Sequence, residues 1–322
     1  MTARDLGLIA LVAGLLALVP LAVTANTVLN FLVLVLIVAL AAQGWNLLGG
    51  FGGQLSFGHA AFFGTGAYAT AILQARYGVN AWIGLAIGIA AGAIVGWVIG
   101  FLSFRAGLRG SYFALVTLAF AEVLRIAANA SPFTGGAAGL LVKLDPRPEN
   151  LQFTSRAAFY WLALGAVTLV LVLSRAIERS RFGAQLIALR ENEDAARALG
   201  VDPLGVKLRA IAMSGAITAT AGCLYVQYFL YLDANIAFGV WISVEALLAA
   251  MVGGVGTVFG PLVGALALHG LGEVTKSFAG RVPGIDLVAF GVLLVVVVAF
   301  APQGVLGIAG RFRRRAREQE RA

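Results

Sequence analysis

The sequence predicts an all-α polytopic membrane protein with about nine or ten transmembrane segments. Two of these segments are expected to be broken by glycine or re-entrant, within an internal pseudo-repeat. Of the 322 residues, 60% are hydrophobic and 12% are charged, whereas about a quarter are charged in an ordinary soluble domain. The apolar residues form runs long enough to cross a bilayer, and the basic residues cluster between these runs.

The transmembrane segments are predicted from the apolar runs, because a helix needs about 20 residues to cross a hydrocarbon core of about 30 Å. The candidate runs are Leu6–Val23, Val28–Leu48, Gly58–Leu73, Trp82–Phe104, Ser111–Ala128, Ala157–Ile177, Leu208–Leu232 and Ile285–Phe300. The first run is long for a signal peptide and more spans follow it, so we expect an uncleaved helix. A further apolar stretch, Val240–Glu273, is too long for one crossing and is interrupted by glycines and Pro261.

The positive charges predict an orientation, because cytoplasmic loops of membrane proteins are enriched in Lys and Arg. With a cytoplasmic N-terminus, the clusters Arg105–Arg109 and Arg175–Arg209 lie inside and the loop Ser131–Arg156 lies outside. A single crossing by Val240–Glu273 would then place the basic C-terminal tail outside. We therefore expect this stretch to enter and return, as a hairpin or as two crossings, so that both termini are cytoplasmic.

The chain is expected to form one transmembrane domain over residues 1–310, with a cytoplasmic segment at about 178–209 and a basic cytoplasmic tail at 311–322. Membrane orientation explains the positive clusters, so membrane lipid is an expected partner and nucleic acid is not. No metal or cofactor is expected, and the single cysteine cannot form an internal disulfide. The spans contain no HExxH, GxSxG or paired aspartates, so no catalytic residue is expected.

Two glycine-rich stretches, Gly49–Gly66 and Gly253–Gly264, are predicted to be unwound. Each contains GGxG followed by Phe-Gly. Non-helical backbone in a bilayer must be paired or wetted, because each bare peptide group costs several kcal/mol in hydrocarbon. Paired broken segments are typical of a transport path between repeats. Close helix packing by small residues is the alternative explanation of the glycines.

Polar residues in the first stretch favour the transport path, because polar groups within a membrane are usually functional. The residues expected to line the path are Gln54, Ser56, His59, Thr117, Gly253, Gly254 and Gly256. A half-helix that begins near Ser56–Gly58 would offer free N–H groups to a carboxylate. A packing role for His59 is the alternative.

Other charged residues in the apolar runs have structural or weaker functional interpretations. Glu122 and Arg125 lie three residues apart on one predicted span and are expected to form a structural ion pair near its outer end. Participation in the path is the alternative. Glu245, His269 and Glu273, all on the broken stretch, are weaker candidates for the path.

The charged stretch Glu178–Arg209 between two apolar spans is predicted to contain a short helix over Ala184–Leu199. The pairs Arg190–Asp194 and Glu193–Arg197 are four residues apart and would share one face. A short helix held between two spans is well shaped to receive force from a cytoplasmic partner. A solvated surface loop is the alternative.

The end of this helix and the start of the next are marked by local signals. Gly200 is expected to stop the helix in a left-handed conformation. Asp202 is expected to cap a new helix whose first position is Pro203.

No Walker A pattern occurs, since none of the lysines Lys143, Lys207 and Lys276 follows a glycine. The chain is therefore not expected to be an enzyme. If ATP drives it, another chain binds the nucleotide.

Five motifs together resemble the LivM-type permease subunits of the branched-chain amino acid ABC importers, and the resemblance covers most of the chain. The motifs are GWNLLGGFGGQLSFGHAAFFGTGAYA at Gly44–Ala69, GSYFALVTLAFAEVLR at Gly110–Arg125, FTGGAAGL at Phe133–Leu140, RFGAQLIALRENEDAARALGVD at Arg181–Asp202 and SVEALLAAMVGGVGTVFGPLVGA at Ser243–Ala265. The third motif departs from the family in having Ala137 and Ala138 where a polar residue is expected.

This resemblance implies a bacterial inner-membrane permease that translocates branched-chain or related amino acids. The implied partners are a homologous permease subunit, two cytoplasmic ATP-binding subunits and a periplasmic substrate-binding protein. The docking segment of the family matches this chain at Arg190, Glu191, Asn192, Glu193, Ala196, Leu199 and Gly200. Alternatives are an importer of the same class that carries urea or short amides, and a gradient-driven secondary transporter or channel.

Overall fold

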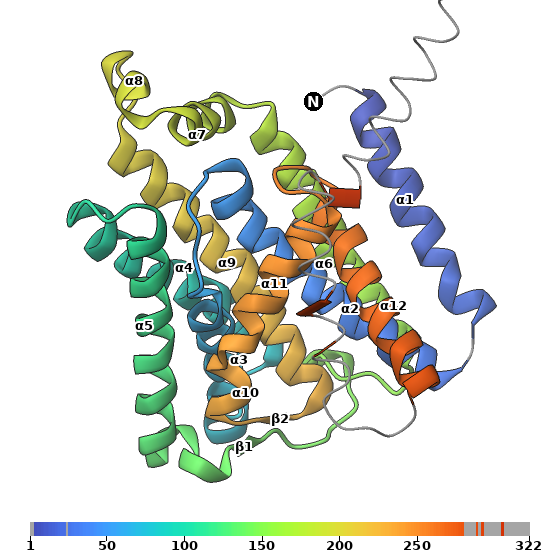
Figure 1. The fold of residues 1–322 in the computed structure, drawn as a ribbon. Coiled ribbons are helices and arrows are strands. Elements are labelled where there is room, and N and C mark those ends of the chain that lie inside the picture. Colours follow the sequence, from blue (N-terminus) through green and yellow to red (C-terminus); the bar gives the residue numbers. More distant parts are fainter. Residues whose placement is uncertain (1–2, 24, 280–287, 289–290, 293–303, 306–322) are drawn as a thin grey trace, which may run out of the picture.

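The computed structural model describes residues 3–23, 25–279, 288, 291–292 and 304–305, which form an almost entirely helical structure (Figure 1). The long helices are α1 (Ala3–Ala22), α2 (Asn26–Trp45), α3 (His59–Tyr77), α4 (Ala81–Arg105), α5 (Gly110–Ala130), α6 (Arg156–Glu178), α9 (Pro203–Phe229) and α12 (Gly260–Ala279). The shorter ones are the π-helical η1 (Asn46–Phe51), α7 (Arg181–Glu191), α8 (Glu193–Ala198), α10 (Ala234–Phe238), α11 (Val240–Gly253) and the single turns η2 (Pro132–Thr134), η3 (Gly136–Ala138) and η4 (Pro148–Asn150).

Seven helices in the described part of the chain are long and apolar enough to cross a membrane. They are Arg4–Ala22, Asn26–Phe51, Ala81–Arg105, Gly110–Ala130, Arg156–Glu178, Pro203–Phe229 and Ala234–Gly253. The prediction of an all-α polytopic membrane protein is therefore confirmed. Most of the predicted span Ile285–Phe300 and all of the tail 311–322 lie outside the described residues.

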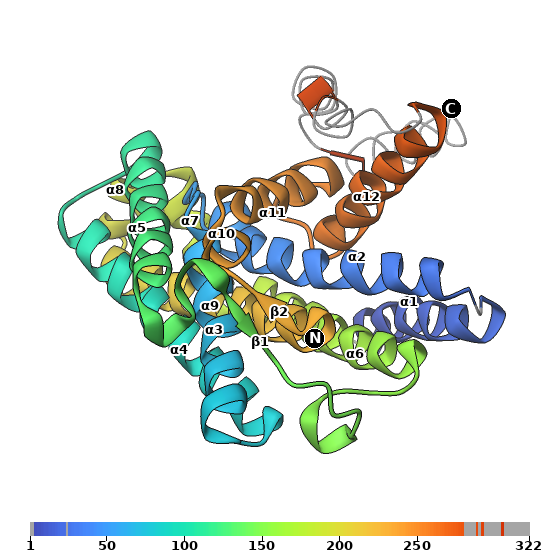
Figure 2. The ribbon, with the colours of Figure 1, turned by 90° about the horizontal axis from the view of Figure 1, so that it is seen from below.

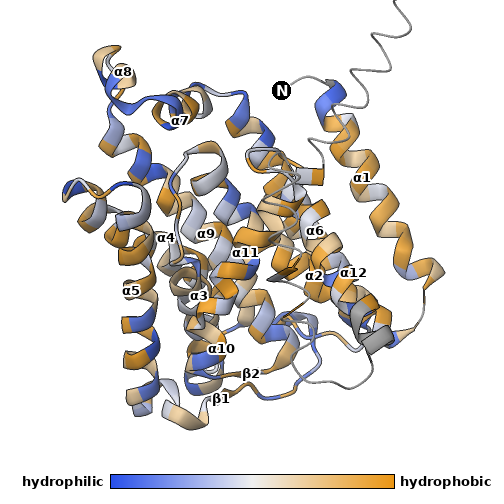
Figure 3. Ribbon diagram, in the orientation of Figure 1, coloured by the Kyte–Doolittle hydropathy of each residue, from blue (hydrophilic) through white to orange (hydrophobic). Residues whose placement is uncertain are grey.

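The helices form a bundle in which α9 is central and packs against α4, α3 and α2 (Figures 1 and 2). The helices α7 and α8 lie at one end of the bundle. At the opposite end, β1 (Leu140–Leu141) pairs antiparallel with β2 (Tyr231–Leu232) beside α10. Hydrophilic residues gather at these two ends and apolar residues lie between them, as expected for a bundle that spans a bilayer (Figure 3).

The stretch Val240–Glu273 is broken, as its glycines predict: α11 is followed by the non-helical residues 254–259 and then by α12. The two helices run antiparallel, because Gly253 lies against Gly260 while Gly264 lies against Ala249. A Cβ atom at Gly253 would be 2.8 Å from the backbone nitrogen of Gly264. Glycine therefore allows the two backbones to touch.

The helix predicted over Ala184–Leu199 is wrong in one respect, because it is divided into α7 and α8 at Asn192. This residue has an extended backbone (φ −159°), and its side chain accepts a hydrogen bond of 2.9 Å from the N–H of Ala195. Asparagine favours such a capping position over a helix interior, which explains the break. The predicted Arg190–Asp194 pair does not form, and Arg190 binds Glu191 instead.

The other local predictions for this segment are confirmed. Glu193 and Arg197 form an ion pair in which Oε1 and Nη2 lie 3.2 Å apart. Gly200 has φ +85°, in the left-handed region. The carboxylate of Asp202 accepts hydrogen bonds from the N–H groups of Leu204 and Gly205, each 3.1 Å long, at the start of α9.

A ridge of glycines brings α4 against α3 and α9. Five glycines repeat at every fourth position and share one face of α4: Gly84, Gly88, Gly92, Gly96 and Gly100. A Cβ atom at Gly92 would be 2.8 Å from the carbonyl oxygen of Gly215, and one at Gly96 would be 2.7 Å from that of Ile211. Such close contact gives helices in a membrane their packing energy.

We expect Gly92→Leu to destabilise the bundle by about 1–3 kcal/mol, because the larger side chain separates α4 from α9. Thermal unfolding in detergent measures this loss. Gly165→Leu is the matched control, since a Cβ atom at this position on α6 meets no atom within 4 Å. Equal stability of the two variants would contradict the close packing described here.

Candidate functional site

The first glycine-rich stretch leaves the helical conformation directly after η1. Gly53 adopts φ +66°, and residues 53–58 are non-helical until α3 begins at His59. Figure 1 shows this segment running from the α7 end of the bundle toward its middle. Ser56 and Gly58 are buried in the bundle outside any helix, so the polar groups of this part of the backbone need other partners.

Ser56 and Thr117 supply two of these partners. The hydroxyl of Ser56 accepts a hydrogen bond of 3.1 Å from the N–H of Gly58. Thr117 on α5 accepts one of 3.2 Å from the N–H of Phe57 and donates one of 2.8 Å to the carbonyl of Ala114. Both side chains are fully buried. The two predicted path residues thus hold the unwound backbone in place.

His59 begins α3 in a buried polar cluster with Ser214 of α9. The hydroxyl of Ser214 donates to the carbonyl of Gly44 over 2.7 Å and lies 2.9 Å from Nε2 of His59. Because this hydroxyl has one proton, Nε2 must be the donor in the second bond. Nδ1 is then an acceptor, and it has no hydrogen-bond partner in the described structure.

The expectation of free N–H groups near Ser56–Gly58 is wrong for Phe57, Gly58 and Ala60, because each of these N–H groups has a hydrogen-bond acceptor. The N–H groups of Phe57 and Gly58 have the side-chain acceptors given above. Further on, the N–H of Ala60 donates to the hydroxyl of Ser243 on α11 over 2.8 Å. A substrate carboxylate could bind here only by displacing protein hydroxyls.

The second unwound stretch lies against η1, which precedes the first stretch, through the side chain of Asn46. Its Oδ1 accepts from the N–H of Gly256 over 2.8 Å, and its Nδ2 donates to the carbonyl of Thr257 over 2.9 Å. One turn earlier, Gln43 donates to the carbonyl of Val258 over 2.7 Å. Two buried amides of the α2–η1 segment therefore satisfy the backbone of residues 256–258.

The glycines of the second stretch provide its backbone geometry. Gly254 has φ +130° and Gly256 has φ +73°, which are strained for other residues. Gly253, the last residue of α11, packs on α12 as described above. Of the three glycines predicted to line the path, Gly256 alone is hydrogen-bonded to η1. Gly253 and Gly254 instead shape the hairpin of α11 and α12.

Gln54 is set apart from the other predicted path residues. Its amide donates to the carbonyl of Gly52 over 3.1 Å, and its side chain is half-buried. The neighbouring Gly53 and Leu55 are exposed. The unwound stretch therefore reaches the surface of this chain at residues 53–55 and is buried at Ser56.

Arg190, at the end of α7, joins the α7–α8 segment to both unwound stretches. Its Nη1 donates to the carbonyl of Gly50 in η1 over 3.0 Å. Its aliphatic part covers Gly53, where a Cβ atom would be 3.0 Å from the Cβ of Arg190. A Cβ atom at Gly256 would be 3.3 Å from the same Gly50 oxygen and 3.4 Å from Nη1 of Arg190. Arg190 therefore contacts the first stretch at Gly53 and the second at Gly256.

The remaining residues of the predicted docking set divide into inward and outward groups. Glu193 accepts from Lys207 over 2.6 Å and from Arg109 over 3.2 Å, which ties α8 to α9 and to the α4–α5 loop. Ala196 is buried and Asn192 caps α8, so both are structural.

The outward group contains the side chains that a partner can reach. Leu199 is 87% exposed. The side chain of Glu191 is 68% exposed. Gly200 ends the segment beside Leu199 in the left-handed conformation. The sequence motif therefore combines exposed residues with residues that hold the segment in shape.

Two charged pairs lie on predicted spans. Arg125 binds Glu122 through two hydrogen bonds of 2.9 and 2.6 Å and donates a third, of 2.7 Å, to Asn235 on α10. His269 on α12 lies 3.1 Å from Glu245 on α11, whereas Glu273 is exposed. The first pair connects α5 with α10, and the second connects the two arms of the hairpin.

Sequence reasoning missed the buried polar residues Gln43, Asn46, Ser214 and Ser243, which satisfy the unwound backbone and His59. One signal was present for the first two. Gln43 and Asn46 are three residues apart, on one face of the otherwise apolar second half of the run Val28–Leu48. No group of three or more His, Cys, Asp or Glu in the described residues could hold a metal ion.

Comparisons with known proteins agree with this architecture. The model of the family described as "Branched-chain amino acid transport system / permease component" matches residues 27–298. LivM of Escherichia coli K12, a high-affinity branched-chain amino acid transport system permease protein, is 30% identical over 311 residues, covering 89% of this chain and 71% of LivM. A probable LivM of Methanocaldococcus jannaschii is 28% identical over 274 residues, or 79% of this chain and 78% of that protein. LivH of Escherichia coli K12 is 29% identical over 158 residues, or 49% of each chain.

We expect Asn46→Leu to free the backbone of residues 256–257, because each buried group left without a partner costs about 1–3 kcal/mol. Hydrogen–deuterium exchange should become faster at the amide of Gly256, whose N–H donates to Asn46. Asn129→Leu is the control, since this exposed residue on α5 makes no side-chain hydrogen bond in the described structure. Unchanged exchange at Gly256 in the Asn46 variant would show that the amide is protected by something else.

Proposed function

Because this chain belongs to the family of branched-chain amino acid transport permease components, we propose that it is a membrane-spanning subunit of an ATP-driven importer of branched-chain amino acids. A homologous permease subunit completes the membrane part, as the similarity to both LivM and LivH supports. Two ATP-binding subunits power the importer. A periplasmic binding protein delivers the substrate, in keeping with the residence of a bacterial importer in the inner membrane.

The observation that carries this proposal is the contact, inside a bundle of spanning helices, between the second unwound stretch and η1, the segment that leads directly into the first unwound stretch. A zwitterion cannot cross hydrocarbon unaided, since one charge at the bilayer centre costs at least about 2.5–3.5 kcal/mol. Backbone freed from a helix, together with Gln54, Ser56, His59 and Thr117, gives such a solute a polar route. The glycines Gly253, Gly254 and Gly256 let the second stretch bend beside it.

The proposed importer function also predicts how the chain crosses the membrane. The seven described spans, with α3, α12 and the predicted span Ile285–Phe300, give ten membrane segments, or nine if the α11–α12 hairpin is scored once. The side chain of Asp5, in the first turn of α1, binds Arg175 near the α7 end of α6 over 2.6 Å. This contact supports a cytoplasmic N-terminus on the same side as α7 and α8. The basic tail 311–322 belongs on that side too.

The segment α7–α8 is the docking element for the ATP-binding subunits. Leu199 and Glu191 supply its exposed contacts, while Glu193 and Ala196 hold it rigidly on the membrane helices. Closure of the two nucleotide-binding subunits displaces α7. Arg190 then carries this displacement to Gly50 and to the unwound stretches.

The test of the proposal is uptake by proteoliposomes that contain the chain, its copurifying subunits and the cognate binding protein. Labelled leucine, isoleucine and valine should accumulate when ATP is enclosed with the ATP-binding subunits. Accumulation of urea or acetamide instead would assign the chain to another substrate class of the family. Uptake that needs a proton or sodium gradient and no ATP would contradict the proposal.

Leu199→Asp is expected to weaken assembly with the ATP-binding subunits by about tenfold or more, because an apolar anchor is replaced by a charge. Affinity purification of the complex at several salt concentrations measures this effect. Leu141→Asp provides the control. Leu141 is 76% exposed, but it lies in β1 at the opposite end of the bundle. Equal loss of assembly in both variants would indicate general damage rather than docking.

Arg190→Gln is expected to leave assembly and ATP hydrolysis intact but to reduce uptake by about tenfold or more. The variant loses a charge-assisted hydrogen bond, which is worth about 1.5–3 kcal/mol, to Gly50. The ratio of amino acid imported to ATP hydrolysed is the measurement. Arg190→Lys should recover part of this ratio, and Arg197→Gln should leave it unchanged. Full coupling in the Gln variant would remove Arg190 from the transmission route.

A further inference from the structure

Helix α1 leaves a groove between itself and the rest of the bundle. It packs mainly on α6 and lies at the outer edge of the bundle in Figures 1 and 2. Two cavities lie on the side of α1 that faces residues 257–266. The cavity at the α7 end is charged, and the one further along α1 is apolar.

The charged cavity has a volume of about 260 Å³ and lies between the ends of α1 and α6. Asp5, Arg175 and Glu178 line it. Arg175 donates to Asp5 over 2.6 Å and also donates to Glu178. These bonds use two of the five N–H donors of its guanidinium, and its side chain is 27% exposed. Arg175 can therefore bind an anionic oxygen in the cavity as well.

The charges around this cavity favour a phosphate. Arg179 donates to Asp5 over 3.2 Å, and Arg4 lies in the same turn of α1 as Asp5. With Arg175 they give three positive charges, against the two carboxylates of Asp5 and Glu178. A phosphodiester group carries one negative charge and balances the difference. Basic pockets between transmembrane helices bind lipid headgroups for this reason.

The apolar cavity has a volume of about 180 Å³. Its lining consists of leucines and valines of α1, α2 and α12, together with Tyr160 of α6. The hydroxyl of Tyr160 already donates to the carbonyl of Leu16 over 2.8 Å. A space with such a lining excludes water and accepts hydrocarbon.

The two cavities are spaced like the headgroup and the acyl chain of a phospholipid. Val12 and Leu16, which line the apolar cavity, lie about 10 and 17 Å beyond Asp5 along α1, at a rise of about 1.5 Å per residue. One leaflet provides about half of the hydrocarbon core of about 30 Å. On the opposite wall, residues 257–259 border the charged cavity and Val263 borders the apolar one, about one turn further on. The cavities thus lie in line along one groove.

Side-chain bonds to α6 hold α1 in this position at both ends. At the α7 end, Asp5 binds Arg175. Toward the other end, Trp161 donates to the carbonyl of Ala17 over 3.1 Å, beside the bond made by Tyr160. The groove is therefore a built part of the fold, because α1 cannot close it without giving up these bonds.

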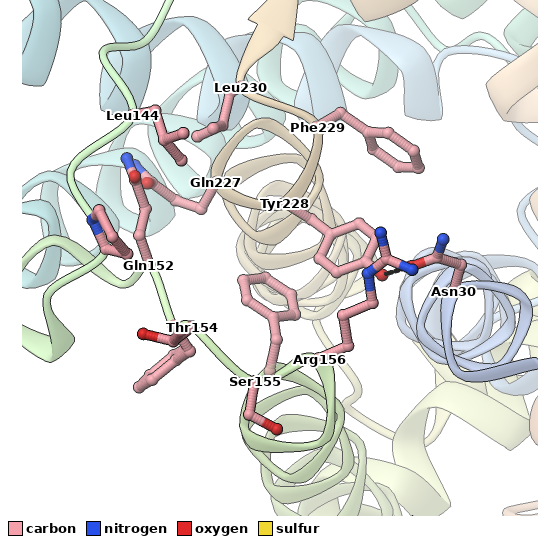
Figure 4. A pocket seen from close by; sticks show the side chains of 13 residues that line it. Asn30, Leu144, Gln152, Thr154, Ser155, Arg156, Gln227, Tyr228, Phe229 and Leu230 are labelled. Atoms are coloured by element: carbon pink, nitrogen blue, oxygen red, sulfur yellow. Dashed lines mark hydrogen bonds between the residues drawn. The ribbon is translucent and has the colours of Figure 1, made fainter. Parts of the chain in front are cut away.

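A cavity at the other end of the bundle has a different character (Figure 4). It has a volume of about 380 Å³ and opens between the loop before α6 and the end of α9. Polar side chains line it, among them Gln152, Thr154 and Arg156. This lining does not suit an acyl chain. The groove beside α1 differs because it combines a charged end with an apolar one.

We infer that the groove beside α1 binds one phospholipid from the leaflet at the α7 end of the bundle. The phosphate lies in the charged cavity at Arg175, and one acyl chain fills the apolar cavity between α1 and α12. The headgroup then touches the second unwound stretch at residues 257–259. This site goes beyond the proposed function and does not depend on which solute is carried.

The experiment is thermal unfolding of the full chain with its copurifying subunits in dodecylmaltoside, after removal of bound lipid. Added dioleoyl-phosphatidylglycerol should raise the melting temperature by several degrees and then saturate, because a ligand that binds the folded form stabilises it. Dioleoylglycerol, which has the same chains but no phosphate, should raise it less. Native mass spectrometry should show about one phospholipid retained per chain.

Two substitutions fill the apolar cavity from opposite walls, Val12→Phe and Val263→Phe. Without lipid, each variant should melt at least as high as the wild type, because the cavity is filled. Each should lose the rise that the phospholipid causes. Leu11→Phe is the matched control and should keep the rise, since Leu11 is the neighbour of Val12 but is 59% exposed. The melting temperature without lipid shows whether each variant is folded.

Arg175→Gln tests the headgroup end of the groove. Asp5 keeps Arg179 as a partner in this variant, so α1 stays attached to α6. The phospholipid should then raise the melting temperature no more than dioleoylglycerol does. Arg105→Gln is the control, because it removes a positive charge at the end of α4, where Arg105 lies over the ring of Phe101. This variant should keep the advantage of the phospholipid.

Four outcomes would overturn the inference. The first is a rise that persists in both cavity-filling variants or is lost equally in Leu11→Phe. The second is a wild type that dioleoylglycerol stabilises as strongly as the phospholipid does. The third is a disulfide between Val12→Cys and Val292→Cys, which would show that the predicted span Ile285–Phe300 fills the groove. The fourth is loss of the partner permease subunit from the Val12→Phe complex, which would show that this subunit covers the groove.

Discussion

The structure depends on the need to satisfy backbone polar groups wherever a helix is interrupted inside an apolar bundle. The N–H groups of Gly53 and Gly254 still bond to the carbonyls one turn back, but those of residues 54–58 and 255–259 make no i→i−4 bond in the described structure. Asn46, Gln43 and Thr117 replace some of these bonds from neighbouring helices. Each replacement is worth more here than at a surface, because water is not there to compete. The interruption is therefore a stable feature of the fold and remains available for transport.

This arrangement also explains why glycine is concentrated in two different kinds of place. In α4, the glycine ridge allows α9 to approach at backbone distance, so the central helices form a rigid block. In Gly53 and Gly256, glycine instead permits positive φ values at which the chain turns away from a helix. The closely packed helices and the glycine turns are therefore distinct uses of glycine in one bundle.

Sequence patterns predicted the features that hydropathy and turn chemistry determine. They missed the features that depend on contacts between residues far apart in the chain. The broken stretch Val240–Glu273 and the cap at Asp202 followed from glycines, charge and local hydrogen bonding. The break at Asn192 was missed because the helical periodicity on both sides of it is continuous. The role of Asn46 depends on a contact across 210 residues of chain, which no local pattern contains. The free N–H groups expected near Gly58 failed for the same reason, since Thr117 and Ser243 approach from other helices.

The division of one motif into inward and outward residues agrees with the proposed role of this segment in coupling to the ATP-binding subunits. A segment that contacted a partner but was not fixed to the membrane helices would rotate under an applied force. The force would then not reach those helices. Glu193 prevents this by binding Lys207 and Arg109 at once, and its side chain is only 15% exposed, so solvent weakens these bonds little. With α8 held on α9 in this way, the proposed docking force on the exposed Leu199 would reach the unwound stretches through Arg190, which bonds to Gly50. This bond ends on η1, a short π-helical segment of a kind found frequently at functional sites.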